Sequence, residues 1–118
     1  MALGKENGLA TRVWLVRHGE TEWNTERRIQ GHTDTCLSAR GLEQAERVAE
    51  RLAGEPLAAV YSSDLQRARK TAEAIAGRHG LAVVADAGLR EAGFGEWEGL
   101  NHAELMERFP EAYRLWRE

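Results

Sequence analysis

An unbroken apolar run that ends in an arginine and a histidine constrains this chain more than any other feature. Val13–Val16 contains no polar residue and leads directly into Arg17 and His18. A short continuous apolar run is typical of a strand that is buried on both faces, as in a parallel sheet. Gly19 lets the backbone turn, so the strand can stop there and both polar side chains can serve one site. The run therefore predicts a ligand site at the carboxyl end of a buried strand.

Helical and strand patterns alternate along the rest of the chain. A helix with Ser38 as its N-cap precedes a strand, a second helix that Ser62, Ser63 or Asp64 can cap, and a third strand. This order predicts right-handed crossovers and a parallel sheet. The predicted ranges are a strand at 13–16, a polar loop at 21–36, a helix at 38–52, a strand at 57–61, a helix at 65–76 and a strand at 81–85.

The two ends of the chain carry other signals. Residues 1–10 are polar around Lys5 and predict a disordered lead-in, which leaves 11–118 as the N-terminal portion of a single domain. Asn101 is the predicted N-cap of a short helix, with Glu104 placed as in a capping box. Pro110 interrupts this helix and precedes one more helical start.

Composition and charge exclude several kinds of partner. A chain of 118 residues is long enough for one compact domain. Its net charge of −3 gives no general attraction to nucleic acid, so an anion site has to be built from local basic groups. No apolar run approaches the length of a membrane span, and the single cysteine, Cys36, excludes an internal disulfide. We therefore expect a cytoplasmic protein with no nucleic-acid and no membrane partner.

Three places carry residues suited to phosphate chemistry. Arg17 and His18 end the first predicted strand, and Arg67 lies in the first turn of the helix that follows the second. Helix N-termini attract anions, and a guanidinium there can hold two phosphate oxygens at once. Glu91 follows the third strand. Taken alone, Arg67 is also consistent with a solvated surface arginine and Glu91 with a surface-loop carboxylate, but the convergence at one sheet edge favours a shared site.

The same residues lie in motifs that resemble a known family. The motifs are Leu15-Val16-Arg17-His18-Gly19-Glu20-Thr21 with Trp23-Asn24, Gln30-Gly31 with Asp34 and Leu37, Tyr61-Ser62-Ser63-Asp64-Leu65-Gln66-Arg67-Ala68 with Thr71-Ala72, and Leu89-Arg90-Glu91 with Phe94-Gly95-Glu96-Trp97-Glu98-Gly99. They resemble the histidine phosphatase superfamily, the phosphoglycerate mutase-like proteins, and within it the phosphatase branch that includes the α-ribazole phosphatases. The resemblance covers Val13 to about Leu105. It implies a three-layer α/β/α fold with a mainly parallel central sheet, incomplete at the C-terminus.

The resemblance implies a role for each site residue. His18 is similar to the family's nucleophile, whose neutral imidazole attacks phosphorus and forms a phosphohistidine. Arg17 and Arg67 are the implied clamp on the phosphate oxygens. Glu91 is the implied acid that protonates the leaving oxygen and later activates water. The further implied phosphate contacts are Asn24, Gln30 and Gly31, and the resemblance implies neither a metal nor a cofactor.

Three functions are compatible with the resemblance. The first is a hydrolase of small-molecule phosphomonoesters, because Phe94 and the run Glu96–Gly99 resemble the phosphatase branch. The second is a phosphoglycerate mutase, although mutases usually carry tyrosine in place of Phe94 and lysine in place of His102. The third is a non-catalytic module that binds phosphate, because the family's second histidine has no counterpart in His32, His79 or His102.

The absent histidine also bears on the length of the protein. We expect the chain to be the N-terminal part of a protein of about two hundred residues, as the resemblance implies. In relatives, the strand that leads to the second histidine lies beside the first strand. Without that neighbour, Val13–Val16 becomes an exposed apolar edge. We therefore expect self-association through this edge and weak turnover by the chain on its own.

Overall fold

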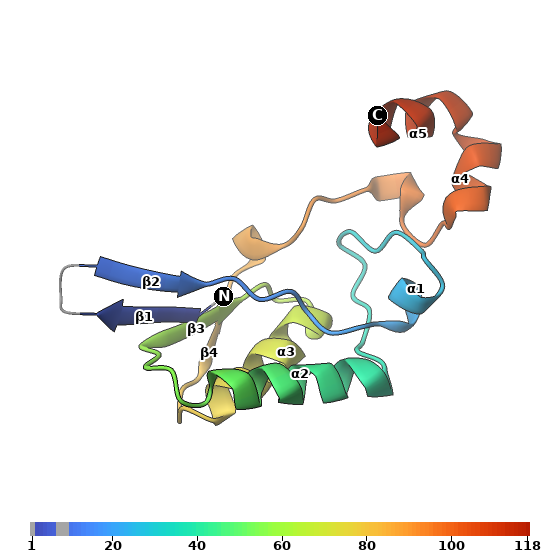
Figure 1. The fold of residues 1–118 in the computed structure, drawn as a ribbon. Coiled ribbons are helices and arrows are strands. Elements are labelled where there is room, and N and C mark those ends of the chain that lie inside the picture. The colour runs from blue at the N-terminus through green and yellow to red at the C-terminus, as the bar shows by residue number, and fades with distance from the viewer. Residues whose placement is uncertain (1, 7–9) are drawn as a thin grey trace.

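A computed structural model describes residues 2–6 and 10–118 and has an α/β architecture (Figure 1). The strands are β1 (Ala2–Glu6), β2 (Ala10–Trp14), β3 (Ala59–Ser62) and β4 (Val83–Ala85). The α-helices are α1 (Glu22–Thr25), α2 (Ala39–Leu52), α3 (Gln66–Gly77), α4 (His102–Arg108) and α5 (Pro110–Arg117). Two short 3-10 helices, η1 (Ala87–Leu89) and η2 (Gly95–Trp97), lie between β4 and α4. The predicted α/β class is confirmed, as is the alternation of helix and strand from α2 to β4.

The four strands form one sheet in the order β2-β1-β3-β4. β1 is antiparallel to both β2 and β3, whereas β3 and β4 are parallel. Strands β2, β3 and β4 therefore run in one direction, as predicted for a mainly parallel sheet. The inserted strand β1 runs against them.

Strand β1 corrects the prediction for the N-terminal segment. The disordered lead-in predicted over 1–10 is wrong for residues 2–6 and 10, which belong to β1 and β2. Met1 and residues 7–9 lie outside the described part of the chain. A strand ladder is made by backbone N–H and C=O groups, so a short polar segment can insert between two strands that both offer an unpaired edge. One of these neighbours, β3, lies far along the chain, and no local pattern reveals it.

Strand β2 ends at Trp14 and lies at the edge of the sheet. The prediction of a buried strand at 13–16 is therefore wrong in its bounds and in its burial, since Val13 is 46% and Leu15 83% exposed. The chain leaves the sheet here because the residues that follow are hydrogen-bonded to α2 and α3 instead of to a neighbouring strand. The self-association expected from this edge stays a prediction.

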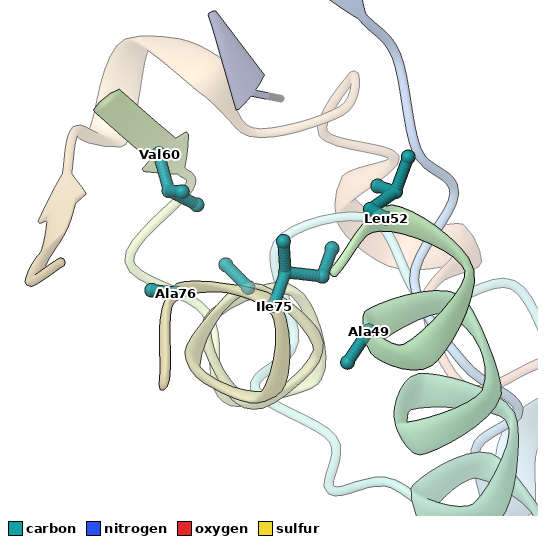
Figure 2. Packing of buried hydrophobic residues seen from close by; sticks show 6 residues of the cluster. Ala49, Leu52, Val60, Ile75 and Ala76 are labelled. Atoms are coloured by element: carbon teal, nitrogen blue, oxygen red, sulfur yellow. The ribbon is translucent and has the colours of Figure 1, made fainter. Parts of the chain in front are cut away.

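The main hydrophobic core lies between α2, α3 and β3. Figure 2 shows Val60 of β3 on one side of α3, beside Ile75 and Ala76, with Ala49 and Leu52 of α2 on the other. All five are at most 3% exposed. Burial of a large aliphatic side chain contributes about 1.5–3 kcal/mol, so these contacts fix the two helices against the sheet. The apolar spacing that predicted both helices is confirmed as their core-facing side.

The starts of the two core helices were predicted with different success. Ser38 caps α2 as predicted, with its Oγ accepting a backbone N–H of the first turn at 3.1 Å. The caps predicted for α3 at 62–64 are wrong, because Leu65 occupies the N-cap position and its side chain makes no capping bond. Asp34 caps this helix from a distant loop, where its Oδ1 accepts the N–H of Gln66 at 2.7 Å. A cap from a distant segment leaves no local pattern.

Helices α4 and α5 form a second cluster away from the sheet (Figure 1). Asn101 caps α4 as predicted, and its side chain accepts the N–H of Glu104 at 2.9 Å. Leu100, Leu105 and Tyr113 are the buried residues of this cluster. Among the described helices, none combines the length and the apolar character needed to cross a membrane.

Gly41 tests the close approach between α2 and the loop that carries His18. A Cβ added at Gly41 would lie 2.0 Å from the carbonyl oxygen of Glu20, so Gly41→Ala has to push two backbone segments apart. We expect the variant to lose about 1–3 kcal/mol of unfolding free energy, the usual range for overpacking. Urea denaturation measures this loss.

Gly77→Ala is the matched control. Gly77 is also helical, and no atom beyond its own helix backbone and chain neighbours lies within 4 Å of an added Cβ. Alanine there should leave stability unchanged or raise it by up to about 1 kcal/mol. Equal losses in the two variants would contradict the close approach.

Candidate active site

The loop that carries His18 is held between α2 and α3. The N–H of Gly19 donates to Thr71 Oγ1 on α3 at 3.1 Å, and the N–H of Glu20 donates to Gln44 Oε1 on α2 at 2.9 Å. Gly19 also packs directly on the backbone of α2, where an added Cβ would lie 2.4 Å from a carbonyl oxygen. The backbone beside His18 is therefore fixed by two helices.

The tautomer of His18 is set by its own backbone. Nδ1 lies 2.6 Å from the carbonyl oxygen of Gly19 and carries the ring proton, because a carbonyl only accepts. Nε2 therefore keeps its lone pair. Burial lowers the pKa of His18 below 6.5, while the hydrogen bond to Gly19 opposes this shift and the charge of Arg67 adds to it. The ring is neutral near pH 7, which is the form that a nucleophilic imidazole needs.

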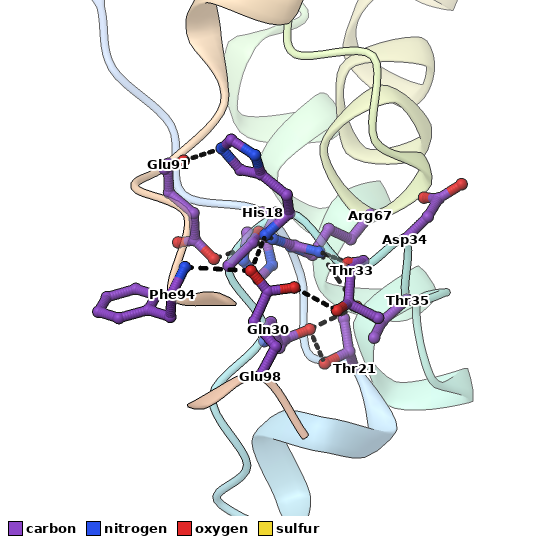
Figure 3. Close-up of polar contacts among 12 residues, drawn as sticks. His18, Thr21, Gln30, Thr33, Asp34, Thr35, Arg67, Glu91, Phe94 and Glu98 are labelled. Atoms are coloured by element: carbon purple, nitrogen blue, oxygen red, sulfur yellow. Dashed lines mark hydrogen bonds and ion pairs between the residues drawn. The ribbon is translucent and has the colours of Figure 1, made fainter. Parts of the chain in front are cut away.

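Arg67 is buried, with 2% of its surface exposed, so it is not the solvated surface arginine of the alternative interpretation. Its Nη1 donates to the carbonyl of Thr33 at 2.6 Å, and Nη2 donates to that of Gly31 at 2.5 Å (Figure 3). Nη2 also donates to Glu91 Oε1 at 2.8 Å, and Nη1 lies 3.3 Å from Thr35 Oγ1. These acceptors use the N–H groups of both terminal nitrogens. A phosphate oxygen has to displace one of them or bind Nε.

A short helix within the loop predicted at 21–36, α1, places Asn24. Thr21 is the N-cap of this helix and is 0% exposed. Its N–H donates to Asn24 Oδ1 at 3.0 Å, and the N–H of Asn24 donates to Thr21 Oγ1 at 3.1 Å. The amide oxygen of Asn24 is thereby engaged, which leaves its NH₂ group for a ligand. The spacing Thr21-x-x-Asn24 is the sequence signal that could have predicted α1.

Gln30 is oriented by the same kind of contact. Its Oε1 accepts from the hydroxyl of Thr21 at 2.7 Å and from that of Thr35 at 2.5 Å (Figure 3). Gln30 is buried, and its NH₂ group is left to donate hydrogen bonds to a ligand. In both amides predicted as phosphate contacts, the oxygen is thus bound to threonine and the NH₂ group is left to donate. Hydrogen-bond donors of this kind can bind an anion.

A cavity of about 500 Å³ lies where these side chains meet. Arg17 lines it and has no hydrogen-bond or ion-pair partner among the residues that the structure describes. Glu91 is the one carboxylate among the described residues of its wall. Gly31 is not part of the wall, and its carbonyl accepts from Arg67 where a donor to phosphate was expected. The predicted site residues that line the cavity are Arg17, His18, Asn24, Gln30, Arg67 and Glu91.

Glu98 joins the two loops beside the cavity, and sequence analysis did not single it out. Its Oε1 accepts from Thr33 Oγ1 at 2.5 Å, and its Oε2 accepts from the N–H groups of His32 at 3.1 Å and Phe94 at 3.0 Å (Figure 3). Burial alone would raise the pKa of Glu98, but these bonds, with one from the N–H of Gly95, lower it to about 2. Two of the partners lie 65 and 66 residues earlier, so no local pattern marks this role.

The histidines other than His18 take no part in the wall of the cavity. His32 supports Glu91 indirectly, because its Nε2–H donates to the backbone carbonyl of Glu91 at 2.9 Å. His79 bonds a backbone carbonyl of α2 at 3.0 Å, and His102 Nδ1 lies 3.0 Å from the hydroxyl of Tyr113. In the described part of the chain, no three histidine, cysteine, aspartate or glutamate side chains are grouped to hold a metal ion.

A comparison with known families agrees with these positions. Residues 13–118 match the sequence model of the histidine phosphatase superfamily, branch 1. The chain belongs to this family. The family predicted from the motifs around His18, Arg67 and Glu91 is thereby confirmed.

Individual relatives show how far the likeness extends. The chain is 52% identical over 104 residues to phosphoglycerate mutase-like protein 4 of Arabidopsis thaliana, covering 86% of this chain and 45% of that protein. It is 40% identical over 105 residues to adenosylcobalamin/alpha-ribazole phosphatase of Escherichia coli, covering 89% and 52%. A solved mycobacterial glucosyl-3-phosphoglycerate phosphatase in complex with VO3 superposes with a TM-score of 0.80 at 44% identity, covering 86% and 48%. The chain thus spans about half the length of the relatives it matches.

Glu98→Gln tests whether ionised Glu98 anchors the loops around Thr33 and Phe94, through the pH dependence of stability. The pKa of Glu98 lies at about 2 in the folded chain, compared with an ordinary value of 4.5. Ionised Glu98 therefore stabilises the folded chain fully when the pH is above about 4.5, and this stabilisation is lost as the pH falls toward 2. We expect the variant to lose about 1.5–3 kcal/mol at neutral pH, the range for hydrogen bonds to a charged group. Its stability should also decline less on acidification. Denaturant unfolding at neutral and at acidic pH measures both effects.

Glu96→Gln is the control for this variant, because Glu96 lies in the same loop and is exposed. It should match the parent protein at both pH values. If the unfolding free energy falls as steeply on acidification in the Glu98 variant as in the parent, the ionised form of Glu98 does not stabilise the fold.

Proposed function

We propose that this chain carries the phosphate site of a phosphomonoester hydrolase that works through a phosphohistidine on His18. The observation that carries the proposal is the 2.6 Å bond from His18 Nδ1–H to Gly19, which leaves a neutral Nε2 in a residue that lines a donor-rich cavity. Membership of the family and the phosphatases among the relatives support it.

In the proposed first step the phosphoryl group moves to His18. The Nε2 lone pair forms a bond to phosphorus while the bond from phosphorus to the leaving oxygen breaks. Glu91, in its protonated form, gives its proton to that oxygen, so the alcohol departs neutral. Arg17, with the amides of Asn24 and Gln30, donates hydrogen bonds to the phosphoryl oxygens. Such preorganised donors supply most of the catalysis in phosphoryl transfer.

In the proposed second step water hydrolyses the phosphohistidine. A water oxygen bonds to phosphorus as the bond to Nε2 breaks, and the Glu91 carboxylate takes a proton from that water. Inorganic phosphate leaves. His18 is again neutral and Glu91 again protonated, so one turnover restores both groups.

The ion pair between Arg67 and Glu91 requires an exchange of partners before this chemistry. The Glu91 carboxylate accepts from Arg67 at 2.8 Å, and its side chain is 49% exposed, which leaves it room to move. A phosphate dianion competes for the same N–H groups. Once displaced, Glu91 faces an anion in place of a cation, and a carboxylate beside an anion holds a proton more readily. Substrate binding would thereby prepare the acid.

A phosphoglycerate mutase is the second candidate, because of the identity to the mutase-like relative from Arabidopsis. A mutase also has to bind the carboxylate of a phosphoglycerate, which calls for a further cation. His102, which stands where mutases usually carry lysine, is bonded to Tyr113 and does not line the cavity. This placement supports the hydrolase.

His18→Ala should abolish hydrolysis of an aryl phosphate by the intact protein, because no phosphohistidine can form. Arg67→Ala should lower the rate by about 10²–10³ or more, since it removes a preorganised donor. A colorimetric assay of aryl phosphate hydrolysis measures both. Arg69→Ala is the control, because Arg69 lies on the same helix with a side chain that is 46% exposed. Substantial turnover by the His18 variant would contradict the proposed nucleophile.

Hydrolase and mutase differ in the fate of the phosphoryl group. We expect the intact protein to release inorganic phosphate from several phosphomonoesters, and to interconvert 2- and 3-phosphoglycerate no faster than background. Phosphorus NMR of one reaction mixture follows both outcomes. Efficient isomerisation of 3-phosphoglycerate would overturn the hydrolase in favour of the mutase.

A further inference from the structure

A second ion pair lies beside the contact between Arg67 and Glu91. Arg90 donates through Nε to Asp64 Oδ1 and through Nη2 to Asp64 Oδ2, both at 2.6 Å. Two parallel bonds of this kind fix the orientation of both side chains as well as their separation. Asp64 lies just before α3, and Arg90 is the chain neighbour of Glu91.

The two ion pairs link the same two segments, and the acid and the base come from opposite segments in the two pairs. The segment at 64–67 supplies the acid of one pair and the base of the other, and the segment at 90–91 supplies their partners. The pairs differ in what a ligand does to them. In the proposed function, a phosphate that binds Arg67 displaces Glu91 from it, whereas the pair of Asp64 and Arg90 shares no residue with the wall of the cavity.

We infer that the bidentate pair of Asp64 and Arg90 positions the Glu91 carboxylate for proton transfer once substrate has displaced it from Arg67. The inference rests on the proposed function, in which Glu91 protonates the leaving oxygen. Arg90 holds the backbone next to Glu91 from one side, and His32 holds the Glu91 carbonyl at 2.9 Å from the other. Between these two fixed points, the Glu91 side chain can change its partner without leaving the cavity.

Stability and positioning are separate consequences of this geometry. The side chains of Arg90 and Asp64 are 31% and 37% exposed, where an ordinary ion pair contributes little to stability and a bidentate one contributes more. The hydrogen bond from Arg90 lowers the pKa of Asp64, so the pair stays ionised at neutral pH. Its value lies in geometry, since a misplacement of about 1 Å in a catalytic group can cost roughly 10²-fold in rate.

The test uses the dependence of the rate on the leaving group. A proton from Glu91 matters most for a poor leaving group such as phenol and least for a good one such as 2,4-dinitrophenol. Asp64→Asn and Arg90→Lys in the intact protein should therefore lower kcat/KM for phenyl phosphate by about 10–100-fold. They should leave kcat/KM for 2,4-dinitrophenyl phosphate, which reports only the steps up to departure of the phenol, within a few-fold of the parent.

Two controls make the outcomes distinguishable. Glu91→Gln sets the leaving-group pattern expected when the acid is lost, and absence of that pattern there would refute the proposed role of Glu91 itself. Glu46→Gln breaks another surface ion pair, the 3.5 Å contact with Arg78, and should change neither rate. If Glu91→Gln shows the pattern but the Asp64 and Arg90 variants slow both substrates equally or not at all, the positioning role is overturned. The exchanged pair Asp64→Arg with Arg90→Asp should restore part of the phenyl phosphate rate.

Discussion

The buried guanidinium of Arg67 is the constraint on which the rest of the site depends. A buried charge is costly unless it is paired and hydrogen-bonded. Here the carbonyls of Gly31 and Thr33 and the carboxylate of Glu91 meet that requirement. These partners come from two separate loops, so one side chain on α3 orders both of them. The same charge is then in place for an anionic ligand, at the price of one exchanged contact.

The polar network around Arg67 makes a donor-rich cavity in an acidic protein. The net charge is −3, yet the cavity presents the NH₂ groups of Asn24 and Gln30 and the guanidinium of Arg17, which has no partner in the described part of the chain. Threonine hydroxyls and backbone groups hold the amide oxygens of both side chains, so their donors are fixed before any ligand arrives. Fixed donors need no rearrangement as charge develops on a phosphoryl group, which is the physical basis of the catalytic contribution that we propose for them.

Three carboxylates anchor the loops around this cavity and have no direct part in the proposed chemistry. Asp34 caps α3, Asp64 holds Arg90, and Glu98 holds the loops around Thr33 and Phe94. Each accepts two or more hydrogen bonds, which fixes its orientation. Glu91 is different, because it has one charged partner that a ligand can replace. The division between the anchoring carboxylates and the proposed acid, Glu91, follows from the number of bonds that each one makes.

The sequence by itself determined the features that depend on neighbouring residues. Apolar spacing predicted α2 and α3, and the positions of Ser38 and Asn101 predicted the caps of α2 and α4. Side chains at the ends of predicted strands led to His18, Arg67 and Glu91, because parallel strands bring their carboxyl ends to one edge of a sheet. These inferences use interactions within a few residues, or one general rule of topology.

Only the tertiary structure decided the features that depend on distant partners. Strand β1 pairs with β3, Asp34 caps α3, and Glu98 accepts the backbone N–H of a residue 66 positions earlier. The strand predicted at 13–16 ends at Trp14, because the chain after it binds two helices in place of a neighbouring strand. Arg67 was predicted as a clamp, but its engagement by two loops was not. A hydrogen bond between distant segments depends on where the whole fold places them, and a local pattern of residues carries no record of that placement.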